Sequence, residues 1–180
     1  MTTIRTEAPS RRWTAVSKVT VAGLVVGAVL GQVGGAIGIG TAQTILFATS
    51  SVGLTVGVAL MAVRHLRRGQ VLVGAGFAIL AVAETMIWTG GGPEQGGESA
   101  FAGGALFYLP ALLMISLPAA FPWWVRAVGS LAAVSFGIHA YLFLLGVEVT
   151  SQGLPAIVGY VLLTLAVIGW VVSVVRSPDR

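Results

Sequence analysis

The sequence contains no cysteine, and only one of its ten basic residues is a lysine. The absence of cysteine excludes disulfide bonds, thiolate metal sites, thiol catalysis and covalent attachment of a c-type haem. Charged residues are also scarce, at 9% of the chain, compared with about 25% in a typical soluble domain. Since 56% of the 180 residues are hydrophobic, the polar side chains are too few to cover a soluble fold of this size. The composition therefore predicts a membrane protein.

Six mainly apolar runs are each long enough to cross a bilayer, whose core of roughly 30 Å needs about 20 helical residues. The first run is too long for the apolar core of a signal peptide, about 7–15 residues, so we expect it to be a retained helix. The predicted spans are residues 18–38, 43–63, 70–90, 101–121, 123–147 and 153–175, between tails of residues 1–17 and 176–180. The sequence predicts an all-α fold, a polytopic bundle of six transmembrane helices.

The basic residues all fall on one side of this six-span arrangement. They are Arg5, Arg11, Arg12, Lys18, Arg64, Arg67, Arg68, Arg126, Arg176 and Arg180. The loops on the other side contain Glu94, Glu98 and Glu148 and no basic residue. Because loops rich in lysine and arginine stay in the cytoplasm, we predict that both termini are cytoplasmic. His65, within the second basic cluster, is expected to be solvated at the membrane interface.

The same charges define the expected surroundings of the protein. A net charge of +4 can attract nucleic acid, but here the position of the basic residues at the ends of the spans explains it. We therefore expect the lipid bilayer as the partner, and no nucleic acid. The near-absence of lysine and the abundance of glycine, alanine and valine are typical of a GC-rich bacterium. The predicted location is the bacterial cytoplasmic (inner) membrane.

The first span carries a glycine stripe: Gly23, Gly27, Gly31 and Gly35, at a spacing of four residues. On a helix these residues share one face, which allows the backbone of a neighbouring helix to approach closely. The stripe predicts tight packing of this span, either within its own bundle or against a second copy or another subunit of a larger membrane complex.

Two ionisable side chains, Glu84 and His139, lie inside predicted spans. Such residues in a membrane are functional candidates by default, and both are expected about 9–10 Å from the same, outer face, at 1.5 Å per residue. Further polar residues are expected within about 12 Å of that face by the same rise: Gln32, Ser50, Ser51, Tyr108 and Tyr160. We predict that these residues form a ligand-binding polar pocket in the outer leaflet, with Glu84 and His139 as hydrogen-bonded partners.

Three functions remain open at this point. The first is a carrier or small-ligand binding protein that uses the polar pocket, and the second is a structural or accessory subunit. The third is a membrane-embedded enzyme or haem protein, in which Ser50 or Ser51 could act with His139, or His139 could bind iron. The chain has no nucleotide-binding or metalloprotease motif, so an enzyme is the least favoured of the three. We expect no cofactor.

Overall fold

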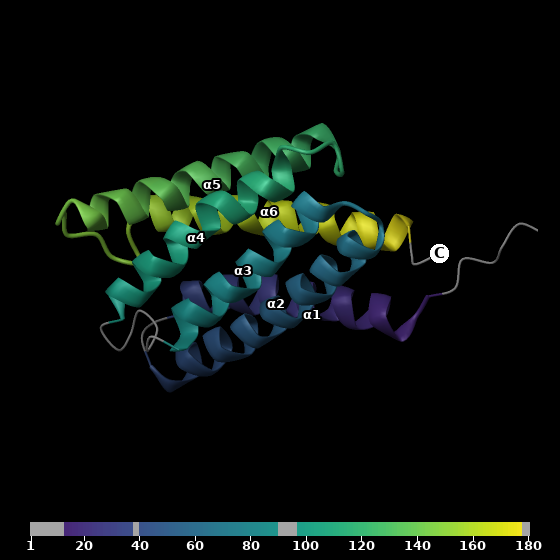
Figure 1. Cartoon of the computed structure of the whole chain (residues 1–180). Coiled ribbons are helices and arrows are strands. Elements are labelled where there is room, and N and C mark those ends of the chain that lie inside the picture. The colour runs from purple at the N-terminus through teal and green to yellow at the C-terminus, as the bar shows by residue number, and fades with distance from the viewer. Residues whose placement is uncertain (1–12, 38–39, 90–96, 178–180) are drawn as a thin grey trace, which may run out of the picture.

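A computed structural model describes residues 13–37, 40–89 and 97–177. The regular secondary structure of these residues is entirely helical, and the helices form one bundle (Figure 1). They are α1 (Ala15–Ala36), α2 (Thr41–Arg67), α3 (Val71–Thr89), α4 (Glu98–Ser116), α5 (Trp123–Leu144) and α6 (Leu154–Arg176). All six are long and apolar enough to span a membrane. The predicted all-α bundle of six transmembrane helices is therefore confirmed.

The helices are arranged as a closed ring. Each helix packs on its neighbours in the chain, and α1 also packs on α6. Because consecutive helices alternate in direction, α1 begins and α6 ends at the same end of the bundle (right in Figure 1). We call this the basic end, because the described arginine and lysine residues lie at or near the helix termini there: Lys18, Arg64, Arg67, Arg68, Arg126 and Arg176.

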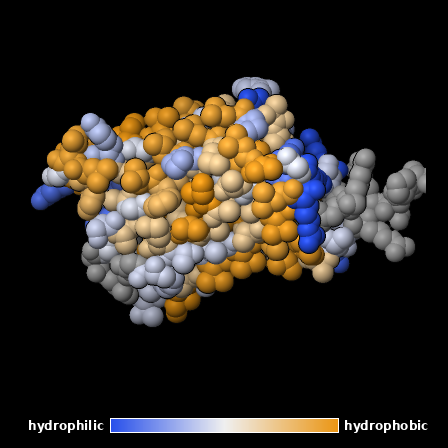
Figure 2. Space-filling model, in the orientation of Figure 1, coloured by the Kyte–Doolittle hydropathy of each residue, from blue (hydrophilic) through white to orange (hydrophobic). Residues whose placement is uncertain are grey.

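The surface of the bundle is suited to lipid rather than water. Large hydrophobic side chains cover its flank, and hydrophilic residues gather toward the basic end (Figure 2). Leu154, for example, is 74% exposed. An exposed apolar surface of this extent indicates a membrane environment. The interior combines aliphatic, small and aromatic residues, such as Leu80, Ala132 and Trp170.

Local signals fix the helix ends, and two of them shift a predicted boundary. The N–H of Ser17 donates to the Oγ1 of Thr14 (3.1 Å), so that α1 begins before the predicted residue 18 with a normal N-cap. Helix α4 ends at Ser116 instead of reaching residue 121. The guanidinium of Arg126 donates to the carbonyls of Ser116 (2.9 Å) and Leu117 (2.8 Å), which satisfies acceptors that a helix C-terminus leaves open.

The glycine stripe packs inside the chain, against α2. Three of its four residues make this contact: Gly23, Gly27 and Gly31. A Cβ atom built on Gly27 would lie 2.7 Å from the Cβ of Leu54, so the two backbones are close enough to require glycine. Gly35 has no neighbour within 4 Å of such an atom. The stripe therefore joins α1 to α2 of the same chain.

His65 corrects a smaller expectation. Its side chain is buried at the basic end, where the ring lies 5.4 Å from that of Phe77 and 5.3 Å from that of Phe121. Its Nδ1 is also hydrogen-bonded to the Oε1 of Gln70. The prediction of a solvated histidine was wrong, because hydropathy does not reveal that two aromatic rings cover it. Five of the charged residues on which the predicted orientation depends lie outside the described residues: Arg5, Arg11, Arg12, Glu94 and Arg180.

Candidate functional site

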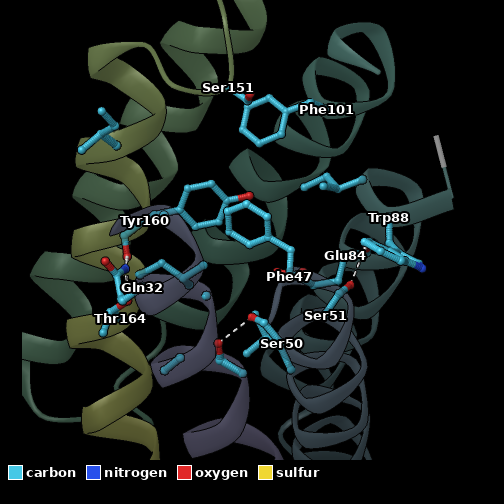
Figure 3. Close-up of a pocket in the computed structure, with 18 of the residues that line it drawn as sticks. Gln32, Phe47, Ser50, Ser51, Glu84, Trp88, Phe101, Ser151, Tyr160 and Thr164 are labelled. Carbon is cyan, nitrogen blue, oxygen red and sulfur yellow. Dashed lines mark hydrogen bonds between the residues drawn. The ribbon is translucent and has the colours of Figure 1, made fainter. Parts of the chain in front are cut away.

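A cavity of about 640 Å³ lies between α1, α2, α3 and α6, in the half of the bundle farther from the basic end (Figure 3). Five of the seven residues predicted to form a polar pocket line it: Gln32, Ser50, Ser51, Glu84 and Tyr160. Tyr108 and His139 do not line it. The polar layer is thicker than expected, since Gln32 lies about 6 Å from the end of α1 and Ser51 about 15 Å from the start of α2, at 1.5 Å per residue.

The polar groups occupy two opposite walls of the cavity. Gln32, Tyr160 and Thr164 lie on one side, and Ser50, Ser51 and Glu84 lie on the other (Figure 3). The Nε2 of Gln32 on α1 donates to the Oγ1 of Thr164 (2.8 Å) and to the carbonyl of Tyr160 (3.3 Å), both on α6. This amide therefore joins the two helices that close the ring.

Glu84 is held by a tyrosine on the neighbouring helix. The hydroxyl of Tyr108 on α4 donates to the Oε1 of Glu84, and both side chains are buried, with Glu84 only 5% exposed. On the side of α2, the Oγ of Ser51 donates to the backbone carbonyl of Glu84 at 3.4 Å. Glu84 supplies the one carboxyl group among the described residues that line the cavity, and these include no lysine, arginine or histidine.

His139 does not pair with Glu84, and the predicted hydrogen bond between them was wrong. Its side chain is fully buried on α5, and neither ring nitrogen has a hydrogen-bond partner among the described residues. The imidazole meets the ring of Phe101 edge to face, with centroids 4.9 Å apart, and Phe101 itself lines the cavity. The spacing in the sequence predicted the depth of each residue approximately, and it did not predict the direction in which the residue projects from its helix.

An aromatic wall backs the cavity and was not foreseen. The ring of Phe136 lies 4.5 Å from that of Tyr108 and 5.1 Å from that of Tyr160, and Tyr160 lies 6.1 Å from Phe101. Other lining residues that the sequence argument missed are Thr44, Phe47, Trp88, Ser151, Gln152 and Thr164. Thr164 had a usable signal, because it follows Tyr160 by one helical turn and so shares its face.

The two serines donate their hydroxyl groups to backbone carbonyls and do not pair with His139. The Oγ of Ser50 donates to the carbonyl of Gly27 at 2.6 Å, so its hydroxyl bridges α2 to α1. Ser51 donates to a backbone carbonyl as well, and His139 lies behind Phe101, outside the cavity lining. A serine–histidine pair is therefore not formed by these residues. Both serines instead join neighbouring helices.

The histidines and acidic residues do not converge either. His65 lies at the basic end and His139 in the opposite half of the bundle, so one chain does not bring them together as a pair of haem ligands. No group of three or more histidine or acidic residues in the described part of the chain could hold a metal ion. The site is a mixed polar and apolar cavity, with one carboxyl group. Comparison with protein-family models, with curated proteins and with solved structures finds no match to this chain.

Proposed function

We propose that the protein binds a small ligand in the cavity between α1, α2, α3 and α6, and that it acts as a small-ligand binding protein or carrier. The observation that carries this proposal is the buried carboxyl group of Glu84 in the cavity wall, with a hydroxyl partner on α4. Polar and ionisable groups are costly inside a membrane and mark ligand or ion pathways there. A cavity lined by hydrogen-bonding groups among apolar residues is a common form of ligand site.

The proposed location is the bacterial cytoplasmic membrane, with the basic end and both termini in the cytoplasm. The support is the one-sided distribution of basic residues, which follows the positive-inside rule. In this orientation the cavity belongs to the outer half of the membrane. A carrier with this arrangement takes up its ligand from, or delivers it to, the outer leaflet or the space beyond it.

The alternative of an accessory subunit loses its main support. It depended on the glycine stripe as a docking face for another protein, and three of the four glycines are covered by α2 of the same chain. Homo-oligomerisation through the stripe loses support for the same reason. Gly35, which faces no other group within 4 Å, lines the cavity.

Access to the cavity can be tested with introduced cysteines, since the chain has none. Ser51→Cys, in the cavity wall, should react with N-ethylmaleimide in nanodiscs much faster than Ala132→Cys, which replaces a fully buried residue of α5. Equal rates for the two variants would mean that small molecules do not reach the cavity, and would count against the proposal.

Binding can be tested by native mass spectrometry of the protein purified in mild detergent. We expect the wild-type protein to retain a small molecule that Ser51→Trp loses, because the indole would take up the space beside Glu84 where we propose that the ligand binds. Val52→Trp is the matched control, since residue 52 is 62% exposed on the lipid-facing side of the same helix. If the wild-type protein carries no additional mass, or if Ser51→Trp retains that mass, the proposed function is wrong.

A further inference from the structure

A second recess lies on the outside of the bundle, in the groove between α1 and α6. Its volume is about 390 Å³, and its lining is mostly valine and isoleucine: Val25, Val29, Val33, Ile168, Val171 and Val172. Val29 is 52% exposed and Ile168 is 49% exposed, so the groove faces the surrounding lipid. We call it the α1–α6 groove.

The groove and the polar cavity are adjacent and share part of their lining. Four residues line both of them: Ala28, Gln32, Thr164 and Val167. The side chain of Gln32 is exposed on α1, and its amide bonds to Thr164 on α6 are part of this boundary. The α1–α6 seam is thus a place where the polar cavity borders a groove on the outer surface of the bundle.

The two sides of α1 differ in how firmly they pack. Toward α2, the backbones meet at glycines, with an added Cβ on Gly27 reaching within 2.8 Å of the backbone nitrogen of Leu54. Toward α6, the packing of α1 is much less extensive. The groove lies here, and it is lined by Val25, Val29 and Val33 of α1 and by Ile168 of α6. Of the two sides of α1, the side toward α6 is therefore the one whose separation would break less packing.

The chemistry of the cavity limits the ligand. Among the described residues that line it, Glu84 can be negatively charged, and no side chain offers a positive charge to a phosphate, sulfate or carboxylate group. Like charges placed together in a low-dielectric site are strongly disfavoured. The hydrogen-bonding groups of Gln32, Ser51 and Tyr160 instead suit a hydroxyl, amide or ammonium group.

We propose, building on the ligand-binding function above, that the ligand is an amphiphile that enters sideways from the bilayer through the α1–α6 seam. Its polar head, which carries no negative charge, occupies the cavity next to Glu84. Its apolar chain remains in the α1–α6 groove and contacts Val29 and Ile168. The continuity of groove and cavity matches the division of such a molecule into a chain and a head.

The ligand class is tested with three photoreactive amphiphiles in phosphatidylcholine nanodiscs. All three carry a dodecyl chain with a diazirine next to the head, and the heads are a hydroxyl, a trimethylammonium and a sulfate group. After irradiation, the labelled residues are mapped by mass spectrometry. We expect the hydroxyl and trimethylammonium probes to label the cavity wall around Ser51 and Glu84, and the sulfate probe to label it much less. Equal labelling by all three probes would contradict the charge argument.

The route is tested by closing the seam. In the Gln32→Cys/Thr164→Cys variant, a short bifunctional methanethiosulfonate should bridge α1 to α6, and a reductant should remove it. We expect the bridge to abolish labelling of the cavity wall and reduction to restore it. Each single-cysteine variant, treated in the same way, is the control: its labelling before treatment is its own baseline, and neither the reagent nor the reductant should change it. Undiminished labelling with the bridge in place would overturn lateral entry.

The results separate this inference from the proposed function. If Ser51→Trp removes a co-purified molecule but none of the amphiphiles labels the cavity, the ligand is not an amphiphile and the binding function remains. If the wild-type protein holds no small molecule and the cavity is unlabelled, both proposals are wrong.

Discussion

Tyr108 gives Glu84 what a carboxyl group inside a membrane protein requires, a hydrogen-bond donor within the bundle. The tyrosine is fully buried on α4 and is packed against the ring of Phe136. Its hydroxyl therefore has a fixed direction, toward the Oε1 of Glu84. The hydrogen bond fixes the carboxyl group of Glu84, which is one of the residues that line the cavity, and it couples α3 to α4 at that depth.

This pairing predicts a strong energetic coupling between two residues. Glu84→Leu and Tyr108→Phe should be non-additive in a double-mutant cycle by about 1–2 kcal/mol, because each variant alone removes the hydrogen bond that the two side chains share. The measurement is the free energy of unfolding of the four proteins in detergent. The control cycle combines Glu84→Leu with His139→Leu and should be additive within about 0.5 kcal/mol. Coupling in the control cycle and none in the first would restore the pair expected from the sequence.

His139 is expected to contribute little to stability. Neither of its ring nitrogens is hydrogen-bonded within the described part of the chain, and burial of an unpaired polar group costs about 1–3 kcal/mol. His139→Leu should therefore unfold at the same or a higher temperature than the wild-type protein.

The matched control for His139 is Ser135→Ala, one turn earlier on α5. The Oγ of Ser135 donates to the carbonyl of Pro155 at 2.7 Å, so its loss should destabilise the protein by about 1 kcal/mol. A lower melting temperature for His139→Leu than for Ser135→Ala would show that the imidazole is important for the fold.

At the residue scale, the sequence predicted chemistry better than direction. Ser50, Ser51 and Tyr160 line the cavity as expected. A polar side chain in a membrane-spanning helix is costly to expose to lipid, and it therefore tends to face the interior of the bundle. His139 obeys the same rule, but it projects between helices toward Phe101. Depth along a helix follows from counting residues, whereas rotation about its axis follows from packing, which a single sequence does not contain.

At the scale of the helices, two positions of the glycine stripe should differ in their tolerance of a larger side chain. Gly27→Ala should lower stability by about 1–3 kcal/mol, because its Cβ would overlap Leu54 and overpacking in a core carries this cost. Gly35→Ala is the control and should be neutral or slightly stabilising, since its Cβ meets no atom within 4 Å and alanine favours a helix by about 0.5–1 kcal/mol. The measurement is the melting temperature of the two variants in detergent. An unchanged melting temperature for Gly27→Ala would contradict the packing of α1 on α2.

The helix boundaries show what hydropathy can and cannot provide. The thickness of a bilayer fixes the length of a span, and for this reason all six helices were found. Hydropathy does not predict helix capping, so it did not predict the hydrogen bonds from Arg126 to the carbonyls at the end of α4. The same holds for Arg64, whose guanidinium donates to the carbonyl of Ser177 just beyond α6.

At the scale of the whole molecule, the predicted orientation in the membrane depends on the basic end. Arg67→Cys, at this end, should react with an impermeant maleimide only after the cells are lysed. Glu148→Cys, in the exposed connection between α5 and α6 at the opposite end, should react in intact spheroplasts. The two variants control for each other, because a reversed orientation exchanges their behaviour, and that exchange would show the proposed topology to be wrong.

The closed ring also has a consequence for how the protein is made. Contacts between consecutive helices can form as each one leaves the ribosome and enters the membrane, since synthesis is vectorial and local contacts form first. The contact between α1 and α6 is different, because it joins the two helices that lie farthest apart in the sequence among the six. Until α6 is inserted, Gln32 has no Thr164 to bind, and membrane lipid borders the unfinished cavity. The side that we assign to the ligand therefore stays open to lipid during synthesis and closes only when α6 packs against α1.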